Sequence, residues 1–280
     1  MNYDLNRNVM LDGGAASTQH LLRPTCADAV DNWVLRLPDE VAETHSRFAS
    51  AGSAILLTCT IHTLPVRSKN WREVVERAVL LARQRVSAAE VWATIGPASL
   101  PGHRWTDAGF DDRARLTASW REMAMGCEEL GAEGFALQSF TDPIECAAAV
   151  AQVRAVVPRL PIAACLTPGD DGRLLDGSDP AKALVLLRQA GASWVGFNCG
   201  SGPAAIEAAL ARAPEADWAK PSRGGVSEDD LVASLVRLAS RCRFVGGCCG
   251  VTPGAIAMLQ RLTTMPLPEM DEDVVASDVL

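Results

Sequence analysis

The sequence lacks the features of several large classes of protein. It has no apolar run approaching the roughly 20 residues of a membrane helix, and residues 1–8 are polar, without the apolar stretch of a secretory signal. Basic residues are in deficit, because 26 Lys and Arg stand against 34 Asp and Glu. A phosphate backbone calls for a clustered basic surface. These absences predict a cytoplasmic protein with neither a membrane nor a nucleic-acid partner.

Two further absences narrow the possible kinds of binding site. Aromatic residues make up only 5% of the chain, with a single tyrosine, so the aromatic cage typical of quaternary-ammonium sites is not indicated. No Gly-x-Gly-x-x-Gly motif follows the first strand-like segment, which excludes the dinucleotide-binding form of an open α/β sheet. Cysteine, in contrast, is abundant. Nine residues, an odd number, indicate free thiols and metal ligands in a reducing compartment rather than a disulfide framework.

Strand-like and helix-like segments alternate along the whole chain. Short runs of apolar and β-branched residues predict eight strands, at 9–11, 54–58, 91–95, 134–139, 162–166, 194–198, 218–220 and 244–246. The segments between them show one apolar face at helical spacing and predict eight helices, at 39–51, 70–86, 111–130, 143–156, 180–190, 202–212, 228–240 and 253–262. Prolines behind Asp142, Asp179 and Thr252 are typical of helix starts.

Strict alternation with unbroken apolar strands indicates a parallel sheet covered by helices. Eight such units match a single (β/α)8 TIM barrel, with a doubly wound open sheet as the alternative. We therefore expect one barrel domain over residues 1–264, followed by an acidic tail at 265–280, where prolines mix with Glu269, Asp271, Glu272 and Asp273. In a barrel, active sites gather at the carboxyl ends of the strands.

An adjacent cysteine pair, Cys248 and Cys249, follows the eighth strand within Gly-Gly-Cys-Cys-Gly at 246–250. Flanking glycines forfeit side-chain packing and allow close backbone approach, which distinguishes this pair from single cysteines in apolar runs. Two thiolates need only one more soft ligand to hold zinc and leave a position open for substrate. Cys199, at the end of the sixth strand, is the candidate third ligand. A strained vicinal disulfide is the alternative.

These motifs carry a specific resemblance. Leu-Asp-Gly-Gly at 11–14, Gly-Phe-Asn-Cys at 196–199, Lys-Pro at 220–221 and Gly-Gly-Cys-Cys-Gly at 246–250 resemble the homocysteine S-methyltransferase family in order and spacing. The resemblance implies a zinc-dependent barrel that moves a methyl group to a thiol, with homocysteine as acceptor and methionine as product. It assigns Cys199, Cys248 and Cys249 as the catalytic zinc ligands.

The resemblance also implies substrate contacts. It implies that Asp12, Gly13 and Gly14 bind the amino-acid portion of homocysteine. We add the strand-end residues Thr58, Gln138 and Asn198 as substrate-binding candidates. Three positions depart from the family pattern. Gln138 stands where an acidic residue is expected to face the substrate ammonium, Cys59 replaces part of a Thr-Asn-Thr run, and Ser222 with Arg223 replaces Asn-Ala.

Several alternatives stay open at this point. A different thiol acceptor, a demethylase using a specialised methyl donor, and a non-catalytic zinc-binding barrel subunit each fit an intact ligand set in a changed pocket. The methyl donor is a small molecule such as a sulfonium, or a corrinoid or folate that arrives free or on a carrier protein. An oligomer is compatible with the sequence, which does not specify the state of association.

Overall fold

The structure, a computed structural model, describes residues 8–13, 33–84, 86, 88–99 and 105–264. Gly14 and the expected tail at 265–280 lie outside these ranges, so the calls made for them, and the 1–264 boundary, stay predictions. The described residues contain eight parallel strands in one sheet, in the order β1-β8-β7-β6-β5-β4-β3-β2. The strands are Val9–Met10 (β1), Ile55–Leu57 (β2), Glu90–Ile95 (β3), Gly134–Phe140 (β4), Ile162–Leu166 (β5), Trp194–Cys199 (β6), Trp218–Pro221 (β7) and Phe244–Val245 (β8).

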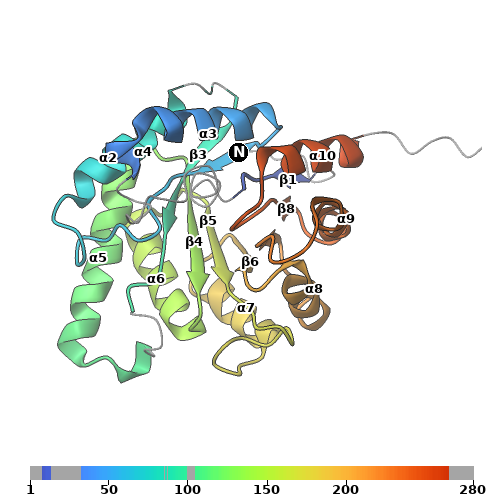
Figure 1. The fold of residues 1–280 in the computed structure, drawn as a ribbon. Coiled ribbons are helices and arrows are strands. Elements are labelled where there is room, and N and C mark those ends of the chain that lie inside the picture. Colours follow the sequence, from blue (N-terminus) through green and yellow to red (C-terminus); the bar gives the residue numbers. More distant parts are fainter. Residues whose placement is uncertain (1–7, 14–32, 85, 87, 100–104, 265–280) are drawn as a thin grey trace, which may run out of the picture.

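The sheet curls into a nearly closed barrel. A parallel bridge between Leu11 and Ile55 links the ends of the sheet, and Ala54 N donates to Met10 O at 2.8 Å beside it. Helices surround the strands (Figure 1). The predicted single (β/α)8 barrel is therefore confirmed, and the open doubly wound sheet is not what the chain forms.

The helices alternate with the strands as the periodicity predicts. They are Pro38–Ser50 (α3), Trp71–Arg83 (α4), Phe110–Glu129 (α5), Pro143–Val156 (α6), Pro180–Gln189 (α7), Pro203–Arg212 (α8), Glu228–Ala239 (α9) and Pro253–Thr264 (α10). Local chemistry explains several starts, because Asp142, Asp179 and Ser227 each accept backbone N–H bonds at a helix N-terminus. Two short elements were not predicted, the helix Trp33–Arg36 (α2) and a 3-10 turn at Trp105–Asp107.

The barrel interior has two chemically different layers. Four aromatic side chains fill its lower part: Trp92 stacks on Trp194 and Trp218 at 5.6 and 6.0 Å between ring centroids, and Phe244 packs against the latter two. Two residues nearer the carboxyl ends of the strands, inward positions are polar on β3 and β7, at Thr94 and Lys220, and remain apolar on β2 and β5, at Leu57 and Cys165. The interior is thus a packed apolar base beneath a mouth that is polar along part of its circumference.

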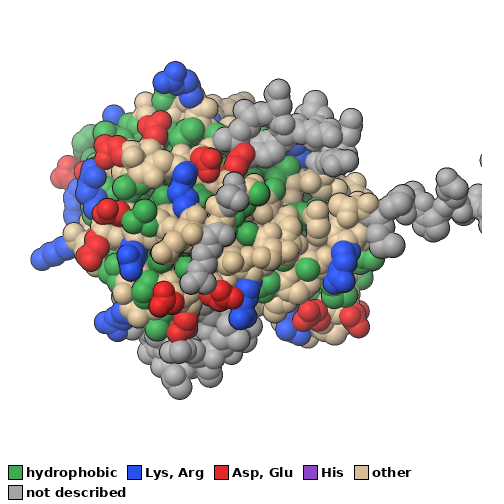
Figure 2. All heavy atoms as spheres, turned by 90° about the horizontal axis from the view of Figure 1, so that it is seen from above, with side chains coloured by type: hydrophobic (Ala, Val, Ile, Leu, Met, Phe, Trp, Pro, Cys, Tyr) green, Lys and Arg blue, Asp and Glu red, His purple; other side chains and the backbone are tan. Residues whose placement is uncertain are grey.

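The outer surface carries charges of both signs. Figure 2 shows Lys and Arg side chains interspersed with Asp and Glu side chains over the face seen there. Among the described residues, no helix combines the length and apolar character needed to cross a membrane.

Candidate metal centre

Three cysteine sulfurs meet at the carboxyl ends of β6 and β8. The Sγ atoms of Cys199, Cys248 and Cys249 lie within 4.8 Å of one another, and Cys249 Sγ is 4.0 Å from each of the other two. A disulfide bond is about 2.05 Å long, so the alternative of a vicinal disulfide is not what the structure contains. The barrel brings together residues that about fifty positions separate in sequence.

Strand β7 ties the two halves of this thiol cluster together. Ser222, directly after β7, donates its backbone N–H to Cys199 O at 3.2 Å and its hydroxyl to Cys199 Sγ at 3.3 Å. Its neighbour Arg223 donates its backbone N–H to Cys249 O at 2.7 Å, and Cys248 N donates to Pro221 O at 2.8 Å. The end of β7 and the loop after it therefore hold both cysteine-bearing loops in place through backbone hydrogen bonds.

The glycines around the cysteine pair are required by close packing. A Cβ atom at Gly246 would lie 2.6 Å from Leu11 Cβ, and one at Gly247 would lie 2.2 Å from Val251 Cβ. Gly250 has φ +77, a left-handed conformation that glycine adopts without steric cost. Close backbone approach, the reason given for these glycines in the sequence, is what the structure shows.

Asn198 connects the cluster to strand β4. Its side chain is fully buried, its Oδ1 accepts from Ser139 N at 2.8 Å, and its Nδ2 donates to Ser139 Oγ at 3.0 Å and points at Cys248 Sγ, 3.8 Å away. Ser139 and Cys199 both have positive φ, 63 and 67, which is unusual for residues with a side chain. These hydrogen bonds hold two strained residues at the edge of the cluster.

The three thiols share their protons unequally. Contacts with Cys248 and then Cys249 lower the pKa of Cys199, whereas contacts with Cys199 and then Cys249 raise the pKa of Cys248. A thiolate on Cys199 is thus stabilised by the two neighbouring thiols. Cysteines elsewhere behave differently: burial in the apolar core raises the pKa of Cys127 and of Cys242 to about 12.

The donor set fits zinc. Tetrahedral zinc with Zn–S bonds of about 2.3 Å holds its sulfur ligands about 3.8 Å apart, close to the 4.0 Å separations here. Three sulfurs at one side of an ion leave a fourth position open. Among the described residues, this is the one group of three or more His, Cys, Asp or Glu residues placed to hold a metal ion.

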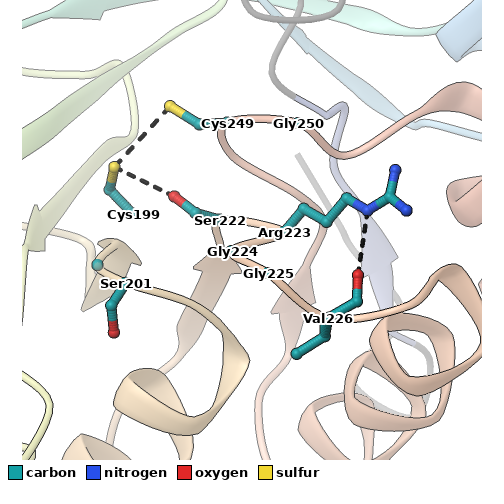
Figure 3. A pocket seen from close by; sticks show the side chains of 10 residues that line it. Cys199, Ser201, Ser222, Arg223, Gly224, Gly225, Val226, Cys249 and Gly250 are labelled. Carbon is teal, nitrogen blue, oxygen red and sulfur yellow. Dashed lines mark hydrogen bonds between the residues drawn. The ribbon is translucent and has the colours of Figure 1, made fainter.

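The open side of the cluster faces a cavity of about 700 Å³. Cys199 and Cys249 line one end of it, and the loop from Ser222 to Val226 forms the wall (Figure 3). The Arg223 side chain runs away from the sulfurs, with Nε donating to Val226 O at 3.3 Å. A second molecule of small-metabolite size can therefore reach the exposed side of the sulfurs.

The predicted substrate residues Asp12 and Thr58 are engaged within the protein. Asp12 is 1% exposed; its Oδ1 accepts from Lys220 Nζ at 2.7 Å and its Oδ2 from Leu57 N at 2.7 Å. Thr58 Oγ1 accepts from Thr94 N and shares a hydrogen bond with Thr60. The Asp12–Lys220 ion pair was missed because nothing in the sequence pairs two motifs 208 residues apart.

Gly13 and Gln138 lie near the same mouth. A Cβ atom at Gly13 would lie 2.5 Å from Val251 O, so this position also needs glycine for packing. Gln138 is 5% exposed, and its Nε2 has no hydrogen-bond partner within the part of the chain that the structure describes. Apart from Gly14, which lies outside that part, the structure gathers the predicted residues at one end of the barrel, and their contacts with substrate stay predictions.

Fold and site together define a class of protein: a (β/α)8 barrel with a three-cysteine candidate metal centre at the end where such barrels carry their chemistry. A profile of the homocysteine S-methyltransferase family matches residues 9–263. The chain belongs to the homocysteine S-methyltransferase family. The predicted resemblance is thereby confirmed, and with it the predicted S-methyltransferase enzyme class at the level of family.

Individual relatives agree with this assignment. The chain is 28% identical over 177 residues to methionine synthase from Mycobacterium tuberculosis, covering 56% of this chain and 15% of that protein. It is 22% identical over 254 residues to the S-methylmethionine–homocysteine S-methyltransferase BHMT2 of Pongo abelii, covering 79% and 68%. The similarity to methionine synthase from Mycobacterium leprae, 24% over 250 residues, covers 21% of that protein. The chain thus spans about a fifth or less of the two methionine synthases.

Solved structures support the fold. The metallated form of the homocysteine methyltransferase MmuM from Escherichia coli superposes with a TM-score of 0.74 at 20% identity, covering 92% of this chain and 97% of that one. Its apo form gives a TM-score of 0.72.

Proposed function

We propose that this protein uses zinc, held by Cys199, Cys248 and Cys249, to transfer a methyl group to the sulfur of a small thiol. The observation that carries the proposal is the trio of sulfurs within 4.8 Å at the barrel mouth, open on one side to a cavity. Homocysteine is the reference acceptor and methionine its product. The names of the relatives, two methionine synthases and an S-methylmethionine–homocysteine S-methyltransferase, support this acceptor.

The chemistry needs a thiolate, because a free thiol with a pKa near 8.5 is mostly protonated at neutral pH. Zinc, when bound, supplies a Lewis acid that favours the deprotonated acceptor thiol. The residues of the chain do the rest. Three cysteines orient the acceptor sulfur, Ser222 and Asn198 hold two of those cysteines in place, and the cavity admits the methyl donor to the exposed side.

The methyl donor is a sulfonium, a folate or a corrinoid. A sulfonium such as S-methylmethionine reaches the 700 Å³ cavity as a free molecule, whereas a folate or corrinoid arrives free or on a carrier protein. Demethylation of a specialised donor uses the same centre, since the methyl group still passes to a thiol. A soluble cytoplasmic setting without nucleic-acid or membrane partners remains our expectation for such metabolism.

Calorimetry tests the proposal. Zinc-loaded protein is titrated with homocysteine in two buffers of different ionisation enthalpy, so that the heat reports both binding and proton release. We expect one site and net release of a proton, because a thiol becomes a thiolate. Cys248→Ser should abolish the signal, and Cys242→Ala, a buried cysteine outside the cluster, should keep it. Zinc-loaded protein that binds thiols but methylates none with any donor would support the non-catalytic alternative.

A second acceptor class is favoured by Gln138. Its side chain is neutral and points into the barrel mouth, where an amino-acid thiol would place its charged end. A thiol without an amino group is therefore the second candidate, and its chemistry at the sulfur is the same.

A further inference from the structure

The polar mouth of the barrel has four inward side chains that surround the approach to the sulfurs. They lie in two pairs on neighbouring strands, Thr94 on β3 with Gln138 on β4, and Asn198 on β6 with Lys220 on β7, on either side of β5. Each is at most 5% exposed. Gln138 is the direct neighbour of Ser139, which Asn198 ties to Cys248. Gln138 is therefore connected to the sulfur cluster through Ser139 and Asn198.

Two of the four side chains are already engaged. Asn198 bonds Ser139 and approaches Cys248, and Lys220 is paired with Asp12, whose second oxygen accepts from Leu57 N. The other two are not: Gln138 Nε2 and Thr94 Oγ1 are buried without a hydrogen-bond partner among the described residues. Thr94 pairs in register with Ala136, so the two groups lie on adjacent strands, with Gln138 two residues further along β4. Buried polar groups in proteins are normally hydrogen-bonded, so this pair points to a ligand.

The charges of the mouth restrict what that ligand can be. Among the described residues of this polar layer, Asp12 is the one carboxylate, and Lys220 neutralises it. The amide of Gln138 carries no charge in either orientation. A buried ammonium would lack a free counter-ion among these residues, because Asp12 is already paired with Lys220. A neutral oxygen satisfies an amide donor and a hydroxyl without any counter-ion.

We infer that the acceptor presents a neutral oxygen, such as a hydroxyl or carbonyl, to Gln138 and Thr94, in the place where homocysteine would present its ammonium. This inference rests on the proposed function and narrows its acceptor to amine-free thiols. Homocysteine then binds through its sulfur but loses the interaction at its other end. The thiol of the inferred class that is matched to homocysteine is 2-hydroxy-4-mercaptobutanoate, which differs from it only in carrying a hydroxyl instead of the amino group.

The test compares three thiols on the zinc-loaded protein by calorimetry. Propane-1-thiol measures binding at the metal alone, and the other two are homocysteine and 2-hydroxy-4-mercaptobutanoate. We expect the hydroxy thiol to bind about tenfold or more tightly than homocysteine. This is the order of difference between a buried polar group that has a hydrogen-bond partner and one that has none. Equal affinities, or tighter binding of homocysteine, would overturn the inference even if all three thiols bind.

A variant pair sharpens the result. Gln138→Glu places a negative charge at the mouth and should invert the preference toward homocysteine. Gln152→Glu makes the same chemical change on α6, in the outer surface groove beside α5, and should leave the ratio unchanged. An unchanged ratio in Gln138→Glu would contradict the role of this residue. If none of the three thiols binds to the zinc-loaded protein, the proposed function fails, and the acceptor class with it.

Discussion

The protein holds the three sulfurs of the cluster in different ways. Cys199 Sγ accepts from Ser222 Oγ at 3.3 Å, and Cys248 Sγ faces Asn198 Nδ2 at 3.8 Å. Cys249 is exposed and meets the other two sulfurs at 4.0 Å. Two of the proposed ligands are therefore oriented by neighbouring polar side chains, and the third is placed by its backbone. Such outer contacts tune both the position and the charge of metal ligands.

Replacing a cluster cysteine should remove the metal. Each of the variants Cys199→Ser, Cys248→Ser and Cys249→Ser exchanges a soft thiolate for a hydroxyl. Zinc affinity should therefore fall by more than about 100-fold, which exceeds the effect of losing a side chain that only contacts a metal ligand. Zinc content after dialysis, measured by mass spectrometry, checks this. Cys242→Ala should retain about one zinc per chain. Full zinc content in any of the three serine variants would exclude that cysteine as a ligand.

Asn198 and Ser222 should matter through the cysteines that they contact. Asn198→Ala and Ser222→Ala should each lower zinc affinity about 10- to 100-fold, measured by competition with a chromophoric chelator. Ser240→Ala is the control and should leave zinc affinity unchanged, because it removes a hydroxyl that donates to Arg237 O at the end of α9, outside the cluster. Unchanged affinity in both Asn198→Ala and Ser222→Ala would show that these contacts are merely structural.

Residue types could be predicted where their chemistry is distinctive. Cys248, Cys249 and Cys199 were identified as ligands from their softness and their strand-end positions, and the structure brings them together. The contacts of Asn198 could not be predicted, because they depend on the unusual backbone of Ser139 on another strand. Gln138 was recognised as a departure, but its unpaired state follows only from the packed mouth.

At the scale of elements, the Asp12–Lys220 ion pair joins the end of β1 to β7, with only β8 between these two strands. Both side chains are almost fully buried, at 1% and 3% exposed. Leu57 N adds a bond from β2, so one carboxylate links three strands. Because β1 has only two paired residues, this interior contact supplements a short edge of the sheet.

Breaking this pair should be costly. Lys220→Met leaves the Asp12 carboxylate buried without its partner, so the free energy of unfolding should fall by about 3–5 kcal/mol in urea denaturation. Adding Asp12→Asn to that variant removes the uncompensated charge and should recover part of the loss. A double variant whose loss equals the sum of the two single losses would contradict the ion-pair account.

Helix α3 carries a buried histidine that should make stability depend on pH. Burial lowers the pKa of His45 from its ordinary value of 6.5, and the nearby Asp12 carboxylate only partly opposes this effect. The unfolded chain then binds the proton first as pH falls, so stability is retained above 6.5 and lost below it, by at most about 1.4 kcal/mol per pH unit. Chemical denaturation between pH 7.5 and 5 measures this.

The matched variant is His45→Gln, which removes the titration. Its free energy of unfolding should approach or exceed that of the wild type as pH falls, although other carboxylates titrate equally in both proteins. Parallel pH curves for the two proteins would contradict the assignment to His45.

Elements were predicted well where the period was regular. The eight strands and eight helices of the barrel were placed within a few residues, because apolar faces and helix-capping residues are local signals. The short helix α2 was missed, since four residues are too few to show a period. The irregular end of β4, where the pairing register shifts between Leu137 and Phe140, also lies beyond a local pattern.

At the scale of the whole molecule, barrel closure turns scattered motifs into one site. The motif residues at 11–13, 196–199, 220–221 and 246–250 converge on one mouth, with an aromatic base beneath it. Zinc binding should therefore stabilise the folded barrel as a unit, by about 2.7 kcal/mol when free zinc is 100 times its dissociation constant. Thermal unfolding with and without a chelator measures this. An unchanged midpoint for the zinc-loaded protein would contradict coupling of the centre to the fold.

X-ray absorption at the zinc edge tests the central claim most directly. The account predicts three sulfur ligands, with a lighter fourth atom, in the zinc-loaded protein alone. Saturating homocysteine should change this to four sulfurs at about 2.3 Å, because the acceptor thiolate takes the open position. An unchanged ligand set in the presence of excess homocysteine, or fewer than three sulfurs at the start, would contradict the claim.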